Sequence, residues 1–475
     1  MRFLILLVFF PISLFAHVNS PDVFFEGNAG PYPLNVAVRL PDAIPGIARI
    51  EIRSSSAAVN QIQVTALRIN GPGAELAPKP DVARQSKGDP QFFVGDLWLM
   101  LRGSWQVRID VDGESGHAEV SVPVPAMATH TVGMEKALEC LLIVLGVILS
   151  AGLISIVGAA VGEATVEPGG IPSVRQKKRS RAAMVVATSM IGIILYAGNS
   201  WWKVEAAFNA QISYKVPVVA ATVDENRLIL RLQNPNTIGW AEKVRLDDFI
   251  PDHDHILHLF LVKIPEMDSF FHLHPEQVEP GVFEQSLPSV AAGRYQLYAD
   301  VVHATGLPET FVGEVQLQGT TGNPLAGDDS AALGVPLSKD STGRRSAGLS
   351  DGGEMVWLQQ NAAFRAREPI QFQFLIKDSD GNPAGDLEPY MGMQGHAQFV
   401  RSDRLVFAHV HPGGTVSMAA LALVGAHTNH IHEGNIPPVI SFLYGFPQPG
   451  LYRVFVQVKR RSRVDTGIFD VQVQP

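Results

Sequence analysis

The chain has 475 residues, of which 46% are hydrophobic and 17% charged, a balance typical of membrane proteins or of heavily buried structure. The formal net charge of −9 is spread thinly along the sequence, which argues against the concentrated basic face that nucleic-acid binding requires. Because Cys140 is the only cysteine, an intramolecular disulfide, a four-cysteine zinc site and a cysteine-bound iron–sulfur cluster are all excluded.

An apolar segment at the amino terminus has the pattern of a secretory signal peptide. Residues 1–16 combine an early cation, Arg2, with a short apolar run and a small residue, Ala16, where a signal peptidase could cut. Cleavage there would leave His17 first, and a free amine beside its own imidazole can chelate copper. The alternative is that His17 is an ordinary residue that follows a cleavage site.

Two further apolar segments predict a transmembrane hairpin within 134–202. They run over about 138–161 and 182–202, and each is long enough to cross a bilayer. The positive-inside rule places the connector 163–181 in the cytoplasm, and the rest of the chain on the periplasmic or outer side of a bacterial inner membrane. The alternative is a buried helix pair in a soluble core. The connector's five cations are Arg175, Lys177, Lys178, Arg179 and Arg181.

The parts outside the hairpin have the pattern of β-rich domains. Short alternating strands between turn signals, such as LNVAVRL and WQVRIDVDG, predict a β-sandwich over 17–133. The same pattern predicts a second sandwich over 203–320 and a third over 355–475. The segment between them, 321–354, is rich in Gly, Ser and Asp and predicts a flexible linker. We therefore expect a mainly β fold, with three immunoglobulin-like β-sandwich domains plus a two-helix transmembrane hairpin.

The second and third sandwiches look like internal copies of one another. HLFLV, FFHLHPE and AAGRYQLYADV in the earlier copy match HAQFV, FAHVHPG and QPGLYRVFVQV in the later one. The first sandwich shares only the last of these elements, as RGSWQVRIDV. The match pairs His258 with His396, His272 with His409, and His274 with His411.

The paired histidines predict a metal site in each copy. Residues two apart in a strand point to the same face, so the histidines of each HxHP motif project together. Hairpins that turn at Pro265 and at Ser402–Asp403 would set the first histidine of each copy opposite the second. Three convergent imidazoles suit zinc or copper. The predicted ligands are His258, His272 and His274 in one copy, and His396, His409 and His411 in the other.

Other residues near these motifs are further candidate ligands or loop residues. The soft side chains Met391 and Met393 favour copper in the later copy and, with His17 and His303, are additional candidate ligands. The acid-flanked pair His253 and His255 is interpreted as solvated loop residues. The alternative for the HxHP histidines is a structural role, in which each ring only hydrogen-bonds to hold a loop.

The HLHPE and PGxYxLYADV elements resemble those of bacterial extracytoplasmic proteins with YtkA-like or FixH-like immunoglobulin-type domains. The resemblance covers 253–318 well and 396–473 more loosely. It implies an immunoglobulin-like fold and an extracytoplasmic compartment, and several such proteins occur in copper-handling contexts. The start HVNSPDVFFEG is similar to that of uncharacterised membrane-anchored members of the same group.

These patterns favour a non-enzymatic function. The sequence contains no GxSxG, HExxH, P-loop or dinucleotide fingerprint. We expect a membrane-anchored protein that binds or handles copper or zinc, with the membrane and other envelope or metal-handling proteins as partners. The alternative is a structural or protein-binding envelope protein that holds no metal.

Overall fold

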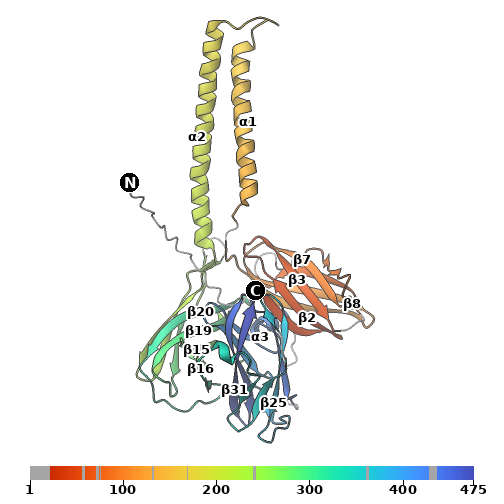
Figure 1. Cartoon of the computed structure of the whole chain (residues 1–475), viewed down its shortest axis with the longest axis vertical. Helices are drawn as coiled ribbons and strands as arrows, with labels where there is room; N and C mark the ends of the chain where they lie inside the picture. The colour runs from red at the N-terminus through yellow and green to blue at the C-terminus, as the bar shows by residue number, and fades with distance from the viewer. Residues whose placement is uncertain are drawn as a thin grey trace. The chain divides into compact units, whose positions relative to one another are not determined.

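The computed structural model describes residues 22–55, 59–70, 74, 76–130, 133–167, 169–238, 242–359, 363–426 and 436–475. The predicted signal peptide, 1–16, and His17 lie outside these residues. The chain forms two compact units, one made of Met1–Ala128 with Lys215–Pro475 and the other of Thr129–Tyr214. The fold is mainly β, as expected, with three β-sandwiches in the first unit and a helical hairpin in the second (Figure 1).

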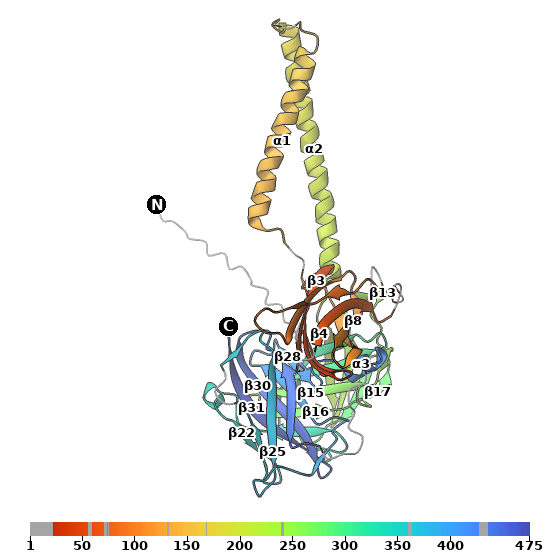
Figure 2. The same ribbon diagram turned by 90° about the vertical axis from the view of Figure 1, so that its right-hand side faces the viewer.

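The hairpin consists of α1 (Lys136–Glu163) and α2 (Val174–Ile212), which lie side by side (Figures 1 and 2). Both helices are long and apolar enough to cross a membrane, and both extend beyond the predicted spans. The Ser180 hydroxyl donates to the Gly158 carbonyl at 2.7 Å, and Gly158 is buried against α2. Gly158 and Gly162 of α1 form a GxxxG spacing and both are buried, so these small residues let the two helices approach closely.

The first sandwich packs two antiparallel sheets over one core. Alternating residues such as Val36, Ile50 and Ile62 are fully buried, while their neighbours face outward. One sheet has the order β1 (Val23–Ala29), β2 (Tyr32–Arg39), β3 (Gly46–Ser54), β7 (Phe92–Leu99) and β6 (Arg84–Gln85). The other has the order β5 (Asp81–Val82), β4 (Val59–Arg68), β8 (Gly103–Gly113) and β9 (Gly116–Ala126).

The second sandwich is built from one continuous ten-stranded sheet that folds over its own core. Its path is β17 (Glu276–Glu279), β18 (Val282–Ser286), β11 (Arg227–Gln233), β10 (Val218–Asp224), β20 (Pro308–Leu317), β19 (Gly293–His303), β15 (Leu257–Ile264), β16 (Ser269–Leu273) and β21 (Ser330–Leu333). Strand β14 (Phe249–Ile250) pairs with β19, and β12 (Thr237–Ile238) pairs with β13 (Glu242–Lys243).

The third sandwich again has two sheets. The first contains β22 (Ser346–Gly348), β23 (Glu354–Trp357), β25 (Ile370–Lys377) and β29 (Val439–Tyr444). The second contains β24 (Phe364–Arg365), β31 (Arg463–Gln474), β30 (Gly450–Arg460), β27 (His396–Arg401) and β28 (Phe407–Val410), with β26 (Leu387–Glu388) on β30. The short helix α3 (Met418–Leu423) follows β28, and a 3-10 turn covers Lys339–Ser341.

The segment 321–354, predicted as a flexible linker, differs from the prediction. It contributes β21, which pairs with β16 of the second sandwich, and β22, which pairs with β23 of the third. The prediction rested on composition, because a segment with few apolar side chains has little to bury in a core. Its order comes from strand pairing and from polar side chains, such as Asp329, that hydrogen-bond to the second sandwich.

The two duplicated sandwiches pack face to face. In β15, Leu257, Leu259 and Leu261 point into the core of the second sandwich, and the alternate residues point toward the third. Phe260 and Val262 there share a small apolar cluster with Phe407 and Phe455 of the third sandwich. Figure 2 shows β15 and β16 beside β28 and β30. The histidines follow the same alternation, so they lie between the two copies and in neither core.

The first sandwich is joined to the third. Phe24 of β1 is fully buried among the core residues of the third sandwich, and its ring lies 5.8 Å from that of Tyr444. The Glu26 amide donates to the Gly413 carbonyl at 2.9 Å, next to the later HxHP motif. The three sandwiches are therefore interdependent, and the experiments proposed below use the whole chain.

Candidate metal centre

Strand pairing corrects the predicted register of both histidine hairpins. In the earlier copy, Phe260 rather than His258 lies opposite His272, and in the later copy Gln398 rather than His396 lies opposite His409. Each turn lies further along the chain than predicted, and each register is therefore shifted by two residues. Because side chains alternate with a period of two, this shift leaves all the histidines on the predicted common face.

The common face is closed to solvent. His272 and His396 have no exposed surface, and His258 and His411 are exposed by 2% and 3%. The rings of the two copies intermingle, since the centroid of His409 lies 5.5 Å from that of His258 and 5.7 Å from that of His272. The sequence could not show which way this face points, and the structure turns it toward the other copy.

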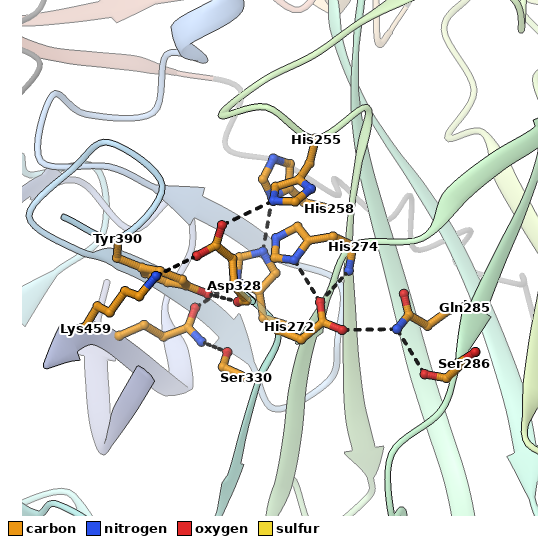
Figure 3. Close-up of polar contacts among 12 residues, drawn as sticks. His255, His258, His272, His274, Gln285, Ser286, Asp328, Ser330, Tyr390 and Lys459 are labelled. Carbon is orange, nitrogen blue, oxygen red and sulfur yellow. Dashed lines mark hydrogen bonds and ion pairs between the residues drawn. The ribbon is translucent and has the colours of Figure 1, made fainter. Parts of the chain in front are cut away.

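The first group unites the three histidines predicted for the earlier copy. His258, His272 and His274 each offer one ring nitrogen within 4.8 Å of the other two. Nδ1 of His258 lies 3.1 Å from Nε2 of His272. Two ligands of one zinc ion, each at about 2.0–2.1 Å and in tetrahedral geometry, are separated by a similar distance of roughly 3.3 Å. Figure 3 shows these rings together with His255.

The second group differs from its prediction in one member. His253, His396 and His411 bring their nitrogens within 4.8 Å of one another, so His253 takes the place predicted for His409. His253 belongs to the loop before β15 and therefore reaches this group from the other copy. His409 lies beside the group, with its Nε2 3.1 Å from Nδ1 of His396, which repeats the close pair of the first group.

The interpretation of His253 and His255 as solvated loop residues holds only in part, because both lie in a loop and are half-buried, while His253 supplies a nitrogen to the second group. The loop 252–255 closes with a bridge between Asp252 and His255, as the loop 390–393 closes between Tyr390 and Met393. His253 and Met391 both adopt left-handed backbone, with φ of +53° and +52°. The loops are therefore equivalent, and both end three residues before the first histidine of their strand, a spacing that was visible in the sequence.

The loop residues have distinct positions around the groups. The His255 ring stacks on that of His274, with centroids 3.9 Å apart. The Met391 carbonyl lies 2.8 Å from Nδ1 of His253. Met393 packs into the core of the first sandwich instead of joining either histidine group. Met391 therefore contacts a histidine through its backbone carbonyl, and Met393 lies away from both histidine groups.

One nitrogen of each ring faces an oxygen acceptor outside the groups. Because neutral imidazole has one N–H, this contact assigns the proton to the outward nitrogen and leaves the inward nitrogen with a lone pair. Such outer contacts commonly orient metal-binding histidines. The outward hydrogen bonds are His258 Nε2 to Asp252 O (2.9 Å), His272 Nδ1 to Gln457 Oε1 (3.0 Å), His274 Nδ1 to Asp329 Oδ1 (2.9 Å), His396 Nε2 to Tyr390 O (3.2 Å) and His411 Nδ1 to Val416 O (3.3 Å). His409 makes a longer outward contact, in which its Nδ1 lies 3.5 Å from Asp300 Oδ2, and this contact does not assign its proton.

The acceptor role of Gln457 is itself determined by its neighbours. The Gln457 amide nitrogen donates to the Ser330 hydroxyl, and its Oε1 also accepts from Gln398 at 3.1 Å. Since Gln457 Oε1 cannot donate, Nδ1 of His272 carries the proton and Nε2 does not. The lone pair of His272 Nε2 then faces the lone pair of His258 Nδ1 at 3.1 Å. A cation between the two nitrogens would convert this repulsion into attraction.

The equivalent ring nitrogens of one histidine in each copy lack any hydrogen bond within the described part of the chain. They are Nε2 of His274 and Nε2 of His411, which occupy equivalent positions in the two copies. A buried polar atom without a partner costs about 1–3 kcal/mol. In each copy, the same nitrogen is thus buried, unprotonated and adjacent to other inward nitrogens.

Electrostatics keeps the rings neutral. Burial holds the pKa of the five most deeply buried rings well below the usual histidine value, and charge repulsion between neighbouring histidines lowers it further. These five rings belong to His258, His272, His396, His409 and His411. The pKa of His274 is also lowered by burial, although the bond to Asp329 opposes the shift. Neutral imidazole is the form that binds metal ions.

Several carboxylates lie next to the histidine rings, on the side away from the converging nitrogens. A hydrogen bond with His255 and the proximity of Lys459 lower the pKa of Asp328 to about 2, against the effect of burial (Figure 3). Burial raises the pKa of Asp300, beside His409, to about 7. Asp328 is thus ionised and supplies negative charge near the imidazole groups, which would offset part of the cost of burying a divalent cation, whereas Asp300 is only partly ionised near pH 7.

His303, another predicted candidate, belongs to neither group. Its Nδ1 lies 2.8 Å from Asp248 and its Nε2 lies 3.0 Å from Glu309, so both ring nitrogens are engaged by carboxylates. Burial alone would lower the pKa of His303, but the bonds to Glu309 and Asp248 outweigh it and raise the pKa. The two carboxylates therefore favour the imidazolium form of this buried ring.

We expect His303→Gln to destabilise the protein by on the order of 3 kcal/mol, since it leaves two carboxylates next to a neutral side chain. A raised pKa means that the imidazolium stabilises the fold fully below the unfolded value of about 6.5 and loses this effect as pH rises through the folded value. The difference in free energy of unfolding between wild type and variant should therefore be larger at pH 6 than at pH 9. Denaturant titrations at the two values measure it, and an equal or reversed difference would contradict the charged state of His303.

Comparison with known proteins adds a partial family match. A family model described as a domain of unknown function (DUF8832) matches residues 349–475, the third sandwich. None of the curated proteins matches the chain.

Among solved structures, the chain is similar to part of a bacterial ice-binding adhesin, at 5% identity over 90% of this chain and 91% of that one, with a TM-score of 0.15. It is also similar to E. coli alpha-2-macroglobulin, at 8% identity over 96% of this chain and 23% of that one, with a TM-score of 0.20. Scores this low establish no common arrangement of domains and assign no function.

Proposed function

We propose that this protein is a membrane-anchored envelope protein that binds two transition-metal ions between its duplicated sandwiches. One ion would be held by His258, His272 and His274. The other would be held by His253, His396 and His411, with His409 as a close neighbour. The proposal rests on the direction of the ring nitrogens: the outward nitrogens face oxygen acceptors, while unprotonated nitrogens converge on two points.

The donor set favours copper or zinc. Imidazole nitrogens bind both metals well, and nitrogen sites generally hold Cu²⁺ more tightly than Zn²⁺. The rings come from two adjacent strands and a loop in each copy, and the close pairs at 3.1 Å recur in both copies. Such prior arrangement reduces the conformational entropy that binding must overcome.

A second candidate is a protein-binding or structural envelope protein in which the histidines only stabilise the interface. The stacking of His272 on Phe260, with centroids 4.3 Å apart, favours this alternative, as does the bond from His272 to Gln457 in the other copy. It does not account for the two equivalent buried nitrogens of His274 and His411 that have no hydrogen bond among the described residues. For that reason we prefer the metal-binding proposal.

The proposed membrane anchor is the hairpin of α1 and α2. Both helices have the length and composition of membrane spans, and the cation-rich connector favours a cytoplasmic loop. The sandwiches would then lie on the periplasmic side of a bacterial inner membrane. In that compartment, other envelope or metal-handling proteins could exchange metal with the site.

The whole chain, purified in detergent and stripped of metal, should take up two copper or zinc ions per molecule. The double variant His274→Gln and His411→Gln removes one inward nitrogen from each group and should lose most of this uptake. Metal analysis after equilibrium dialysis measures the stoichiometry. His117→Gln, whose ring is exposed in the first sandwich, is the matched control and should bind as wild type does. Absence of uptake by the folded wild type, or full uptake by the double variant, would favour the structural alternative.

A further inference from the structure

An exposed apolar patch covers one end of the first sandwich. Ile47, Trp98, Met100 and Leu101, here called the apolar end, are 48%, 59%, 54% and 54% exposed. Ile47 and Trp98 are direct cross-strand partners on β3 and β7, and both point away from the core. Met100 and Leu101 follow in the loop between β7 and β8. Large exposed apolar side chains gathered in this way usually mark an interaction surface.

Strand pairing places the apolar end where the chain leaves the sandwich. Gly103, which directly follows this loop, pairs with Ala126, the last residue of β9. From Ala126, only residues 127–135 separate the sandwich from Lys136, the first residue of α1. A fully extended chain of this length spans at most about 35 Å. The apolar end is thus tethered by a short connection to a helix that we propose to cross the membrane.

The same sheet face changes from apolar to charged with distance from this end. The next outward pair after Ile47 and Trp98 is Arg49 and Asp96. Further along β3 lies Arg53, whose side chain is 51% exposed and forms an ion pair with Asp89. A tryptophan and aliphatic side chains at the tip, followed by charges, match the polarity gradient from acyl chains to headgroups to water.

We propose that the apolar end docks on the lipid surface, with Trp98 at headgroup level and Met100 and Leu101 inserted more deeply. This inference rests on the proposed membrane anchoring and is independent of the metal site. Lipid is preferred to a protein partner because the tether is short and because the apolar side chains are confined to one end of the sheet face and the loop beyond it. Docking would hold the first sandwich, and with it the joined third sandwich, near the membrane.

The test uses the whole chain with Cys140 replaced by Ser and a single new cysteine for an environment-sensitive fluorophore. Met100→Cys reports on the apolar end, and Arg53→Cys reports on the far end of β3 as the matched control. Each labelled protein is reconstituted in phosphatidylcholine–phosphatidylglycerol vesicles with or without lipids that carry a shallow spin label. We expect a blue-shifted emission and at least twofold quenching at position 100, and neither effect at position 53.

The outcomes separate docking from anchoring. If the protein floats with the vesicles in a density gradient but the label at position 100 is not quenched, anchoring holds and docking is wrong. A blue shift without quenching would mean that protein covers the apolar end, and equal quenching at positions 53 and 100 would mean that the sandwich lies flat; both results overturn the proposal. If the chain does not float, anchoring itself fails, and docking fails with it.

Discussion

Metal-free protein should lose stability steeply as pH falls from 6.5 to 5.5. The five most buried rings of the histidine interface have pKa values held well below 6.5 by burial and by one another. In the unfolded chain the same rings accept protons near pH 6.5. Because the unfolded state then binds more protons than the folded state, acid favours unfolding. Stability is thus complete above the unfolded pKa and declines below it.

The expected loss is large. For each ring that must stay neutral in the fold, the free energy of unfolding falls by about 1 kcal/mol between pH 6.5 and 5.5. Five such rings together lower it by on the order of 5 kcal/mol. This is comparable with the whole stability of many domains. Denaturant titrations at pH 7.5, 6.5 and 5.5 measure the effect. The exposed-ring variant His117→Gln should show the same decline, whereas a flat profile would mean that the rings are protonated within the fold.

Metal should oppose this acid sensitivity. An ion that binds only the folded state stabilises it by about 4 kcal/mol for each site when its free concentration is a thousand times the dissociation constant. The interface would therefore be strongest when loaded at neutral pH, and acidification would weaken both metal binding and the packing of the two copies. If the proposed ions bind, the histidine face would link the association of the sandwiches to the presence of the metal.

The sequence predicts which histidines share a strand face, because side chains alternate between the two faces of a strand. The i, i+2 spacing of His272 with His274 and of His409 with His411 is enough to place each pair on one face. The duplication also identifies the equivalent positions in the two copies. The register is missed by two residues, because the length of a turn depends on its backbone conformation, here including a left-handed residue at Met267.

What the sequence cannot supply is the contact between the copies. The face that carries His258 could have pointed to solvent, and its burial depends on the matching face of the third sandwich. His253 joins the second group only because that packing brings its loop to His396. The order of 321–354 has the same origin, since β21 gains its partners from β16, a strand that lies much earlier in the chain. Long-range packing decides these features, and local patterns do not encode it.

The packing between the two copies predicts that one substitution removes one metal ion and leaves the other. His253→Gln should remove one of the two ions, although His253 lies in the sequence of the earlier copy. Its ring centroid is 5.0 Å from that of His396 and 4.9 Å from that of His411, so the substitution takes a ligand from the later group. The earlier group keeps all three of its nitrogens and should still bind one ion.

His255→Gln is the matched control for this substitution. It lies two residues away in the same loop, stacks on His274 of the earlier group and belongs to neither group of three. We expect it to leave the stoichiometry at two ions, while His274→Gln should abolish binding to the earlier group and leave the later one intact. Combining His253→Gln with His274→Gln should then remove both ions. If His253→Gln instead retained two ions, the later copy would bind metal through its own three histidines, with His409 as the third ligand and no contribution from the other sandwich.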